Sequence, residues 1–369
     1  MTGSDTDIIL ETRDLQRRFV IDKPLFGPAK EVRAVDGVTL KIRRGETFAI
    51  VGESGCGKST LARLLVRLID PSGGEVRYDG RDISDIDASE MRGLRRDLQF
   101  IFQDPFSSLN PRMTVGALIE EPLRTHGLGS RKERREKVAA LLGHVGLMPD
   151  HANRYPHEFS GGQRQRIGIA RALACGPKVL IGDEPVSALD VSIQAQVVNI
   201  LEDLKDEFGL TLVIIAHDLA VIRHMADRVA VMYLGQIVET APVADLFRAP
   251  KHPYTEALIA AIPVPRVGVA ERAAKVEGDL PNPIAPPSGC RFHTRCAYAI
   301  ARCATEVPAL SEPAKGRSVA CHRQAELTLA GLPDIDESRT PAAQTRFDFY
   351  RQARAGRDAL LTTISNPEP

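Results

Sequence analysis

The sequence has no excess of charge of either sign and no long apolar run. Lys+Arg and Asp+Glu each number 48, which gives a formal net charge of zero. A protein that coats nucleic acid normally carries a basic excess, so this balance argues against that class. No apolar stretch approaches the roughly 18–20 residues that span a bilayer, and residues 1–7 lack the basic and apolar regions of a secretory signal. We therefore expect a cytosolic protein that reaches a membrane only through a partner.

Cysteine is scarce until one stretch near the C-terminal end. Cys56 and Cys175 stand apart, whereas Cys290, Cys296, Cys303 and Cys321 fall close together. Because disulfides rarely persist in a reducing compartment, such a cluster favours a metal site. We expect Cys56 and Cys175 to be small packing residues rather than ligands.

Three short apolar runs, at residues 47–51, 179–181 and 212–216, have the character of buried parallel strands. Helix-like segments lie between them, such as residues 59–68. The apolar stripe of that segment consists of Leu61, Leu64, Leu65 and Leu68. Strands that alternate with helices predict an α/β sheet whose chemistry lies at the carboxyl ends of the strands.

Other segments follow different patterns. Residues 8–45 contain alternating apolar and polar positions and predict a smaller antiparallel sheet. The segment from about 105 to 170 is charged and helix-rich, so we expect an inserted helical subdomain. Its charge run at 131–137 is expected to be a solvated helix face.

Proline multiplies after about residue 250, which marks a linker or an irregular small domain. The predicted boundaries are 8–250 for the main domain and 251–325 for a cysteine-rich extension. Residues 326–369 are expected to form a polar tail, disordered in part.

The first apolar run leads into Gly52-Glu53-Ser54-Gly55-Cys56-Gly57-Lys58-Ser59-Thr60. This string fits the phosphate-binding loop G-x-x-x-x-G-K-[ST] in its required strand–loop–helix context. Glycines let backbone N–H groups approach phosphate oxygens, and the following helix adds its positive end. Lys58 is expected at the β/γ-phosphates and Ser59 on Mg²⁺. The predicted ATP-binding residues are Gly52, Ser54, Gly55, Cys56, Gly57, Lys58, Ser59 and Thr60.

Polar residues with catalytic potential follow the other two runs. Asp183 and Glu184 follow the second run after Gly182, and His217 follows the third. We expect Asp183 to hold Mg²⁺ through water and Glu184 to polarise the attacking water as general base. His217 is expected to contact the γ-phosphate and to hold Glu184 or the water in place.

A second anion-binding turn is predicted at Ser160-Gly161-Gly162-Gln163. A Ser-Gly-Gly turn that opens a helix offers a hydroxyl and free N–H groups to an anion. One chain does not need two such sites for one nucleotide. In a head-to-tail dimer, however, each turn can close over the ATP of its partner.

Together these residues resemble the ATPases of ABC transporters over about residues 8–250. The resemblance implies that Gln103 reaches Mg²⁺ and senses a membrane subunit, and that Asp190, in the string 187–190, lies across a dimer interface. Phe19 is the candidate for stacking on adenine, with Phe26 as a rival. The implied fold is an α/β P-loop NTPase core with an antiparallel β subdomain, an inserted helical subdomain and a small irregular cysteine-rich C-terminal extension. Since the catalytic set is complete, we expect an active ATPase.

Further strings are similar to those of dipeptide/oligopeptide import ATPases and extend the resemblance to about 8–325. They are residues 104–111, 251–255 and 286–290. This branch implies a peripheral protein at the cytoplasmic face of the inner membrane. Its implied partners are a second ATPase subunit, identical or not, two membrane permeases and an external peptide-binding protein.

The four clustered cysteines follow C-x5-C-x6-C-x17-C. Four thiolates can hold a metal ion or an iron–sulfur cluster. The spacing is looser than the paired C-x2-C of a zinc ribbon, and members of the peptide-import branch carry a similar set that binds [4Fe-4S]. Zinc, with His293 or His322 as spare ligands, and unligated thiols remain alternatives.

Two alternative functions also remain. A transporter of the same type could carry nickel, glutathione or a sugar–phosphate conjugate, because the ATPase subunit does not touch the cargo. A soluble ABC ATPase of translation or DNA repair belongs to a different class. Such proteins usually carry two tandem ATPase units or a long coiled-coil insertion, and neither pattern is present.

Overall fold

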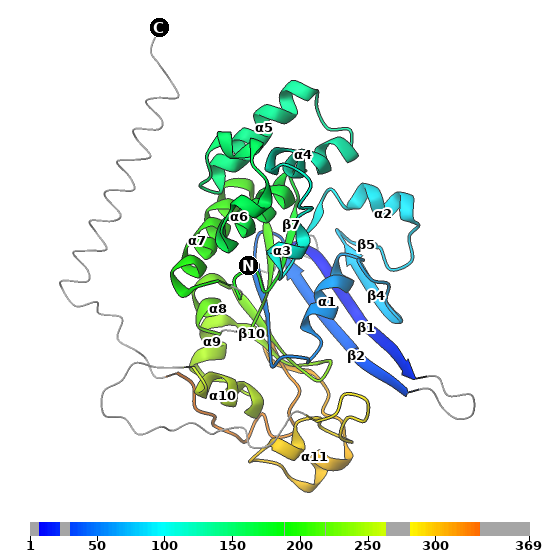
Figure 1. Ribbon diagram of the computed structural model, residues 1–369. Helices are drawn as coiled ribbons and strands as arrows, with labels where there is room; N and C mark the ends of the chain where they lie inside the picture. Colours follow the sequence, from blue (N-terminus) through cyan, green and yellow to red (C-terminus); the bar gives the residue numbers. More distant parts are fainter. Residues whose placement is uncertain (1–6, 23–29, 188, 218, 263–280, 333–369) are drawn as a thin grey trace, which may run out of the picture. The chain divides into compact units, whose positions relative to one another are not determined.

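The computed structural model describes residues 7–22, 30–187, 189–217, 219–262 and 281–332 (Figure 1). Residues up to Gly331 belong to one compact unit, and Leu332–Pro369 to a second. The fold below is that of the first unit. Most of the predicted polar tail at 326–369 lies outside the described residues, as does Phe26.

The central sheet has eight strands in the order β11-β12-β10-β9-β3-β8-β7-β6. Strand β3 pairs in parallel with β8 and β9, and β7 pairs in parallel with β8 and β6. The bounds are β3 Thr47–Val51, β6 Leu98–Ile101, β7 Val179–Asp183, β8 Thr211–Ala216, β9 Arg228–Tyr233, β10 Gln236–Pro242, β11 Ser311–Ala314 and β12 Arg317–Val319. Every residue of β3, β7 and β8 is buried, which confirms the three predicted parallel strands.

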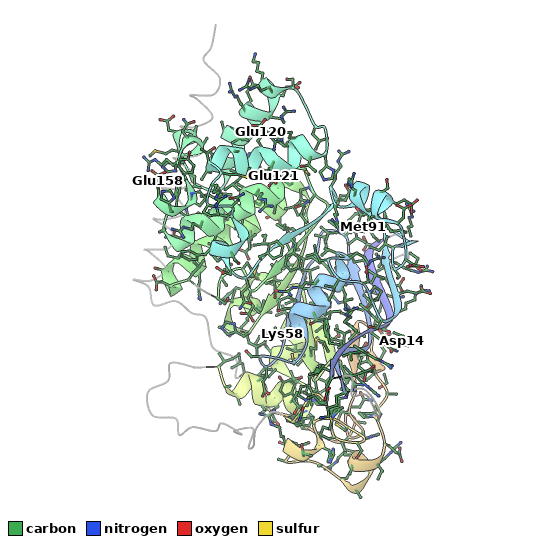
Figure 2. All side chains as sticks on the ribbon, turned by 45° about the vertical axis from the view of Figure 1, so that its right-hand side comes forward. Asp14, Lys58, Met91, Glu120, Glu121 and Glu158 are labelled. Carbon is green, nitrogen blue, oxygen red and sulfur yellow. The ribbon has the colours of Figure 1, made fainter. Side chains whose placement is uncertain are left out.

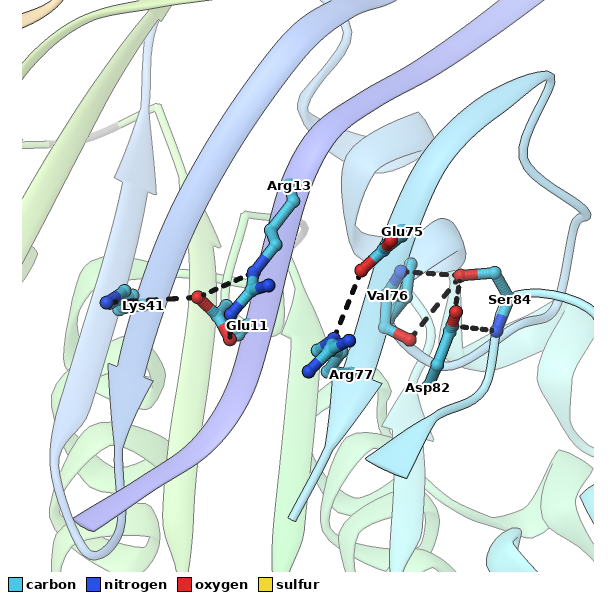
Figure 3. Close-up of polar contacts among 8 residues, drawn as sticks. All are labelled: Glu11, Arg13, Lys41, Glu75, Val76, Arg77, Asp82 and Ser84. Atoms are coloured by element: carbon cyan, nitrogen blue, oxygen red, sulfur yellow. Dashed lines mark hydrogen bonds and ion pairs between the residues drawn. The ribbon is translucent and has the colours of Figure 1, made fainter. Parts of the chain in front are cut away.

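A second, four-stranded antiparallel sheet has the order β2-β1-β4-β5, as the alternating pattern predicts. Its strands are β1 Ile8–Asp22, β2 Lys30–Arg43, β4 Gly73–Tyr78 and β5 Arg81–Asp82. Ion pairs join neighbouring positions, such as Glu11 with both Arg13 and Lys41 (Figure 3). The apolar side chains of this sheet, of helix α1 and of the central strands form one continuous core.

Helix α1 (Lys58–Leu65) is shorter than the sequence predicts. Leu61, Leu64 and Leu65 are buried as expected. The placement of Leu68 on the same buried stripe is wrong, because its side chain is 42% exposed. The helix has already ended there, and Arg67 adopts a left-handed backbone with φ of 52°, which no helix continues.

Most of the other helices lie between β6 and β7 or after β7. Figure 1 shows α4 and α5 at the end of the unit farthest from α11. The bounds are α2 Ala88–Leu94, α3 Pro105–Ser108, α4 Val115–Thr125, α5 Arg131–His144, α6 Gly161–Leu173, α7 Val191–Phe208, α8 Leu219–Met225, α9 Val243–Arg248, α10 Pro253–Ala260 and α11 Ala301–Thr305. Helix α5 begins with a capping box formed by Ser130 and Glu133. Its charged first turns are mostly exposed, as predicted, although Arg134 binds Glu120 at 2.9 Å.

The cysteine-bearing segment, residues 281–332, adds its strand β12 to β10 of the central sheet. A buried carboxylate, that of Glu239, links this segment to the central sheet. Glu239 is fully buried and accepts hydrogen bonds from the backbone N–H groups of Lys251 and His252 and from Arg317 Nη2 at 2.6 Å. The segment is therefore tied to the core by charge as well as by strand pairing.

In the parts of the chain that the structure describes, no helix combines the length and apolar character that a membrane crossing requires.

His252 provides a test of how α10 is anchored. Its ring is buried, its Nδ1 accepts the N–H of Tyr254 at 3.1 Å, and burial lowers its pKa to about 3. Because an unfolded histidine titrates near ~6.5, the neutral ring stabilises the fold above that pH, and the contribution is lost as the pH falls. Between pH 7 and 5 we expect about 2 kcal/mol of the unfolding free energy to disappear through this group.

His252→Asn keeps a capping acceptor but cannot titrate, so its unfolding free energy should fall less over the same range. Denaturant titrations of both proteins at pH 7 and 5 measure the difference. Equal pH dependence in the two proteins contradicts the assignment.

Candidate nucleotide-binding site

The loop at residues 52–57 connects β3 to α1 and has glycines where no side chain fits. A Cβ on Gly52 would lie 2.2 Å from the carbonyl oxygen of Met232, and one on Gly57 would lie 2.0 Å from that of Ala34. Both glycines also have positive φ. The loop is therefore pressed against β2 and β9, while Ser54 and Gly55 at its tip are exposed.

Lys58 opens α1 with its side chain folded back into the loop. Its buried Nζ donates to the carbonyl oxygens of Gly52 at 2.8 Å and Glu53 at 2.9 Å. Gly57 precedes it without a side chain to cap the helix, so the N–H groups of the first turn remain available to an anion. One positive charge and a set of free N–H groups are the features that bind polyphosphate.

Beside the loop, Ser59 and Asp183 form a pair of oxygen ligands. Ser59 Oγ donates to Asp183 Oδ1 at 2.7 Å, and Arg63 Nη2 lies 3.9 Å from the other carboxylate oxygen. Burial raises the pKa of Asp183, although the bond from Ser59 and the charge of Arg63 oppose the shift. A hydroxyl and a carboxylate side by side suit the hard, oxygen-seeking Mg²⁺.

Glu184 stands where three strand ends meet. Its Oε2 accepts a hydrogen bond from Gln103 Nε2 at 2.8 Å and lies 3.6 Å from His217 Nδ1. Its φ of 48° lies in the left-handed region, which a non-glycine residue occupies at a cost of order 1–3 kcal/mol. The structure thus brings together the three predicted catalytic side chains, with a strained backbone at the predicted base.

The predicted Ser-Gly-Gly turn lies away from the phosphate-binding loop of its own chain. Ser160 caps α6 and exchanges two hydrogen bonds with Gln163. Glu158, just before the turn, is well separated from Lys58 (Figure 2). A Cβ on Gly162 would come within 2.5 Å of Ile193 on α7, and one on Gly161 within 3.9 Å of Leu189.

The segment that ends in Asp190 therefore packs beside this turn, and Asp190 itself is exposed at the start of α7. Ala188 lies outside the described residues. The two elements predicted to act on a partner's ATP are neighbours on one surface.

Phe19, on β1, is 37% exposed, and the guanidinium of Arg17 lies 4.7 Å from the centre of its ring. Thr60 is partly buried in the first turn of α1. Cys56 is buried, and burial raises its thiol pKa, as expected of a packing residue rather than a ligand.

Three residues at the loop were not predicted as site residues. The backbone N–H of Glu53 donates to the hydroxyl of Tyr254 at 2.8 Å. The carboxylate of Glu53 accepts two bonds from Arg295, at 2.8 and 3.1 Å. Tyr254 belongs to a sequence segment, residues 251–255, that resembles those of other peptide-import ATPases. Arg295 belongs to no recognisable motif, and only the fold shows that it contacts the loop.

The four clustered cysteines line one pocket together with His293 and His322. All four are free thiols. Burial, together with the other thiols of the cluster, raises the pKa of Cys290 and of Cys296 to about 11. Among the described residues, no group of three or more metal-binding side chains is arranged to hold a metal ion. The donor types fit a thiolate-bound group.

A family profile described as "ABC transporter" matches residues 35–187, and one described as "Oligopeptide/dipeptide transporter, C-terminal region" matches residues 238–303. The oligopeptide transport ATP-binding protein AppF of Bacillus subtilis is 51% identical over 326 residues, which cover 87% of this chain and 99% of that protein. The chain belongs to the ABC transporter family. OppF of Salmonella typhimurium, an oligopeptide transport ATP-binding protein, is 54% identical over 82% of this ABC chain and 92% of its own length. DppF of Pseudomonas aeruginosa, a di/tripeptide transport ATP-binding protein, is 49% identical over 86% and 98%.

Solved structures agree with the family. The ATP-binding cassette MJ0796, a dimer in a post-hydrolysis state bound to ADP and Pi, is 32% identical with a TM-score of 0.58 and covers 64% of this chain and 99% of its own. CbiO1 of Clostridium perfringens, part of the ABC transporter complex cbiONQ, is 29% identical with a TM-score of 0.57 over 65% and 91%. The α/β ABC ATPase fold and the ATP-hydrolysing activity inferred from the motifs are confirmed.

Glu184→Gln tests the role of the carboxylate in this ABC ATPase. An amide keeps the shape and the contact with Gln103 but cannot accept a proton. We expect ATP hydrolysis to fall by about 10²–10⁴-fold, the usual worth of a general base, with ATP affinity retained. Steady-state phosphate release and equilibrium binding measure the two effects. Glu136→Gln, at an exposed position on α5, serves as the control, and near-normal turnover in Glu184→Gln refutes the role.

Proposed function

We propose that this chain is the ATP-hydrolysing subunit of an importer for dipeptides and oligopeptides, bound peripherally at the cytoplasmic face of the inner membrane. The ATP-hydrolysing role is supported chiefly by one observation: Gln103 and His217 both contact Glu184 beside the phosphate-binding loop. The assignment of peptides as the cargo is supported by the C-terminal family profile and by relatives named for peptide transport.

ATP would be held by backbone N–H groups of Gly52 and residues 54–60 and by the Lys58 side chain, with Phe19 against the adenine. Ser59, Asp183 and Gln103 would hold Mg²⁺, which supplies charge neutralisation at the β- and γ-phosphates. Glu184 accepts the proton of the attacking water, and His217, 3.6 Å away, orients that carboxylate.

The second part of each ATP site would come from a partner ATPase, identical or not. Ser160, Gly161, Gly162, Gln163 and Asp190 are assigned to the partner's nucleotide. The separation of Glu158, which lies just before the turn, from Lys58 supports this assignment, as does the packing of the turn beside Leu189. The MJ0796 cassette is also a dimer. ATP would close the dimer and hydrolysis reopen it, which rocks two membrane permeases between outward- and inward-facing states. An external peptide-binding protein would deliver the cargo.

Labelled-peptide uptake tests the cargo. Cells that carry wild-type protein should accumulate dipeptides or longer peptides, and cells that carry Glu184→Gln should not, since uptake depends on hydrolysis. Glu136→Gln provides the matched control. If every peptide enters equally in a variant verified as hydrolysis-dead, peptide is rejected in favour of nickel, glutathione or a conjugate. A failure to co-purify with any membrane permease favours the soluble class instead.

We further propose that Cys290, Cys296, Cys303 and Cys321 bind a [4Fe-4S] cluster that staples this irregular segment. Four free thiols around one pocket support the proposal. Soft thiolates suit iron–sulfur clusters, and the cluster would replace the apolar core that a small segment lacks.

Anaerobically purified protein should then be brown and contain about four iron atoms per chain. Cys296→Ser should lose both properties, whereas Cys175→Ser, outside the cluster, should keep them. Zinc in place of iron supports the zinc alternative with His293 or His322. Protein without either metal supports unligated thiols.

A further inference from the structure

Glu53, the second residue of the phosphate-binding loop, is held at three points. Its N–H donates to Tyr254 Oη at 2.8 Å, and its carbonyl oxygen accepts from Lys58 Nζ at 2.9 Å. Its carboxylate receives Arg295 Nη1 at 2.8 Å and Nη2 at 3.1 Å. Two of these three contacts come from residues more than 200 positions away.

Arg295 is itself firmly placed. Its side chain is 9% exposed, and Nη1 also reaches the hydroxyl of Tyr233 at 3.3 Å. The rings of Tyr233, Tyr254 and Phe292 pack together with centroids 4.7 to 5.3 Å apart. Such aromatic packing restricts motion of the groups that face the loop.

A second anchor flanks the first. Arg291, four residues before Arg295, pairs with Asp36 of β2 and donates to the carbonyl oxygen of Leu234. Ala34, two residues before Asp36 on β2, is the residue whose carbonyl oxygen leaves no room for a side chain on Gly57 of the loop. The cysteine-bearing segment therefore contacts both the loop and the strand that supports it.

On the basis of the proposed ATP site, we propose that Arg295 and Tyr254 are positioning residues that preorganise the phosphate-binding loop for nucleotide through Glu53. The two contacts fix the peptide that carries the carbonyl acceptor of Lys58. A loop already ordered pays less entropy on binding, which favours affinity.

Arg295 has a second effect, which is electrostatic. Glu53 places a negative charge on a loop that must receive a polyphosphate, and like charges in a partly buried site repel strongly. The guanidinium neutralises that carboxylate through a bidentate, charge-assisted pair. Loss of Arg295 therefore both loosens the loop and exposes an unpaired carboxylate. Loss of the Glu53 charge also loosens the loop, but it leaves a guanidinium whose positive charge attracts the polyphosphate.

Because of this difference, Arg295→Gln and Glu53→Gln should have unequal effects on the affinity for ATP. Arg295→Gln should weaken the affinity of the full-length protein for ATP by roughly 10–150-fold, the scale of losing a charged hydrogen bond, while kcat changes little. Glu53→Gln should weaken it less. The double variant should bind ATP more tightly than Arg295→Gln alone, because the unpaired carboxylate is gone. Arg295→Lys keeps the charge without the fork and should recover part of the affinity.

Amide hydrogen exchange without nucleotide provides a readout separate from ATP binding. Peptides that cover residues 52–58 should exchange faster in Arg295→Gln and in Glu53→Gln than in wild type. Arg302→Gln breaks an exposed pair with Glu306 in the same segment and should change neither exchange nor Kd. If Arg295→Gln does not fold, Glu53→Gln and Tyr254→Phe carry the same comparison.

Wild-type affinity and exchange in the variants overturn the positioning role alone. Strictly additive losses in the double variant also overturn it, because they mean that Glu53 and Arg295 act independently. A wild-type protein that does not bind ATP overturns the proposed ATP site and the positioning role with it.

Discussion

Hydrogen bonding among the parallel strands β3, β8 and β7 is the constraint on which the site depends. The register pairs Val51 with Ala216 and Asp183 with Ile215. The next residues along the chain, Gly52, His217 and Glu184, therefore leave the sheet at the same edge. A slip of one residue would turn every side chain of a strand to the opposite face, and the close packing of these buried strands opposes it. The predicted catalytic residues thus owe their proximity to the packing of apolar side chains that belong to none of the predicted ATP contacts.

The residues that the sequence could predict are those whose local pattern and tertiary role coincide. Lys58, Asp183, Glu184 and His217 each follow an apolar strand, so strand recognition and motif recognition support one another. The end of α1 was not predictable in the same way, because nothing in the sequence marks Arg67 as left-handed. The strained φ of Glu184 likewise has no signal in the sequence. Strand β12 has only three residues, too few for an alternating pattern to identify.

The Arg295–Glu53 pair lay beyond sequence reasoning for a different reason. A single ion pair between residues 242 positions apart leaves no periodicity, spacing or composition to detect. Its existence depends on the whole C-terminal segment docking on the core. That docking is enforced by Glu239, since a carboxylate with no exposure must keep its partners or bear a large desolvation penalty. Detaching β12 would remove Arg317 from it, and shifting the start of α10 would remove two backbone donors. The Glu239–Arg317 ion pair therefore helps to hold Tyr254 beside the loop, although Tyr254 is not part of that pair.

The residues predicted to bind the nucleotide and those predicted to hydrolyse it differ in how firmly contacts within this chain fix their geometry. Lys58 and Asp183 are buried and hydrogen-bonded to groups of their own chain. Gln103 is exposed and the His217 side chain is 54% exposed, and each reaches Glu184 through one polar contact. Exposed side chains with few contacts reposition at low cost, so a surface that covers them can change the geometry around Glu184 without disturbing the loop. In the proposed dimer that surface includes the partner's Ser-Gly-Gly turn. Under the proposed function, this division would let one chain bind ATP in an ordered loop, and hydrolysis would require the partner subunit to close over it.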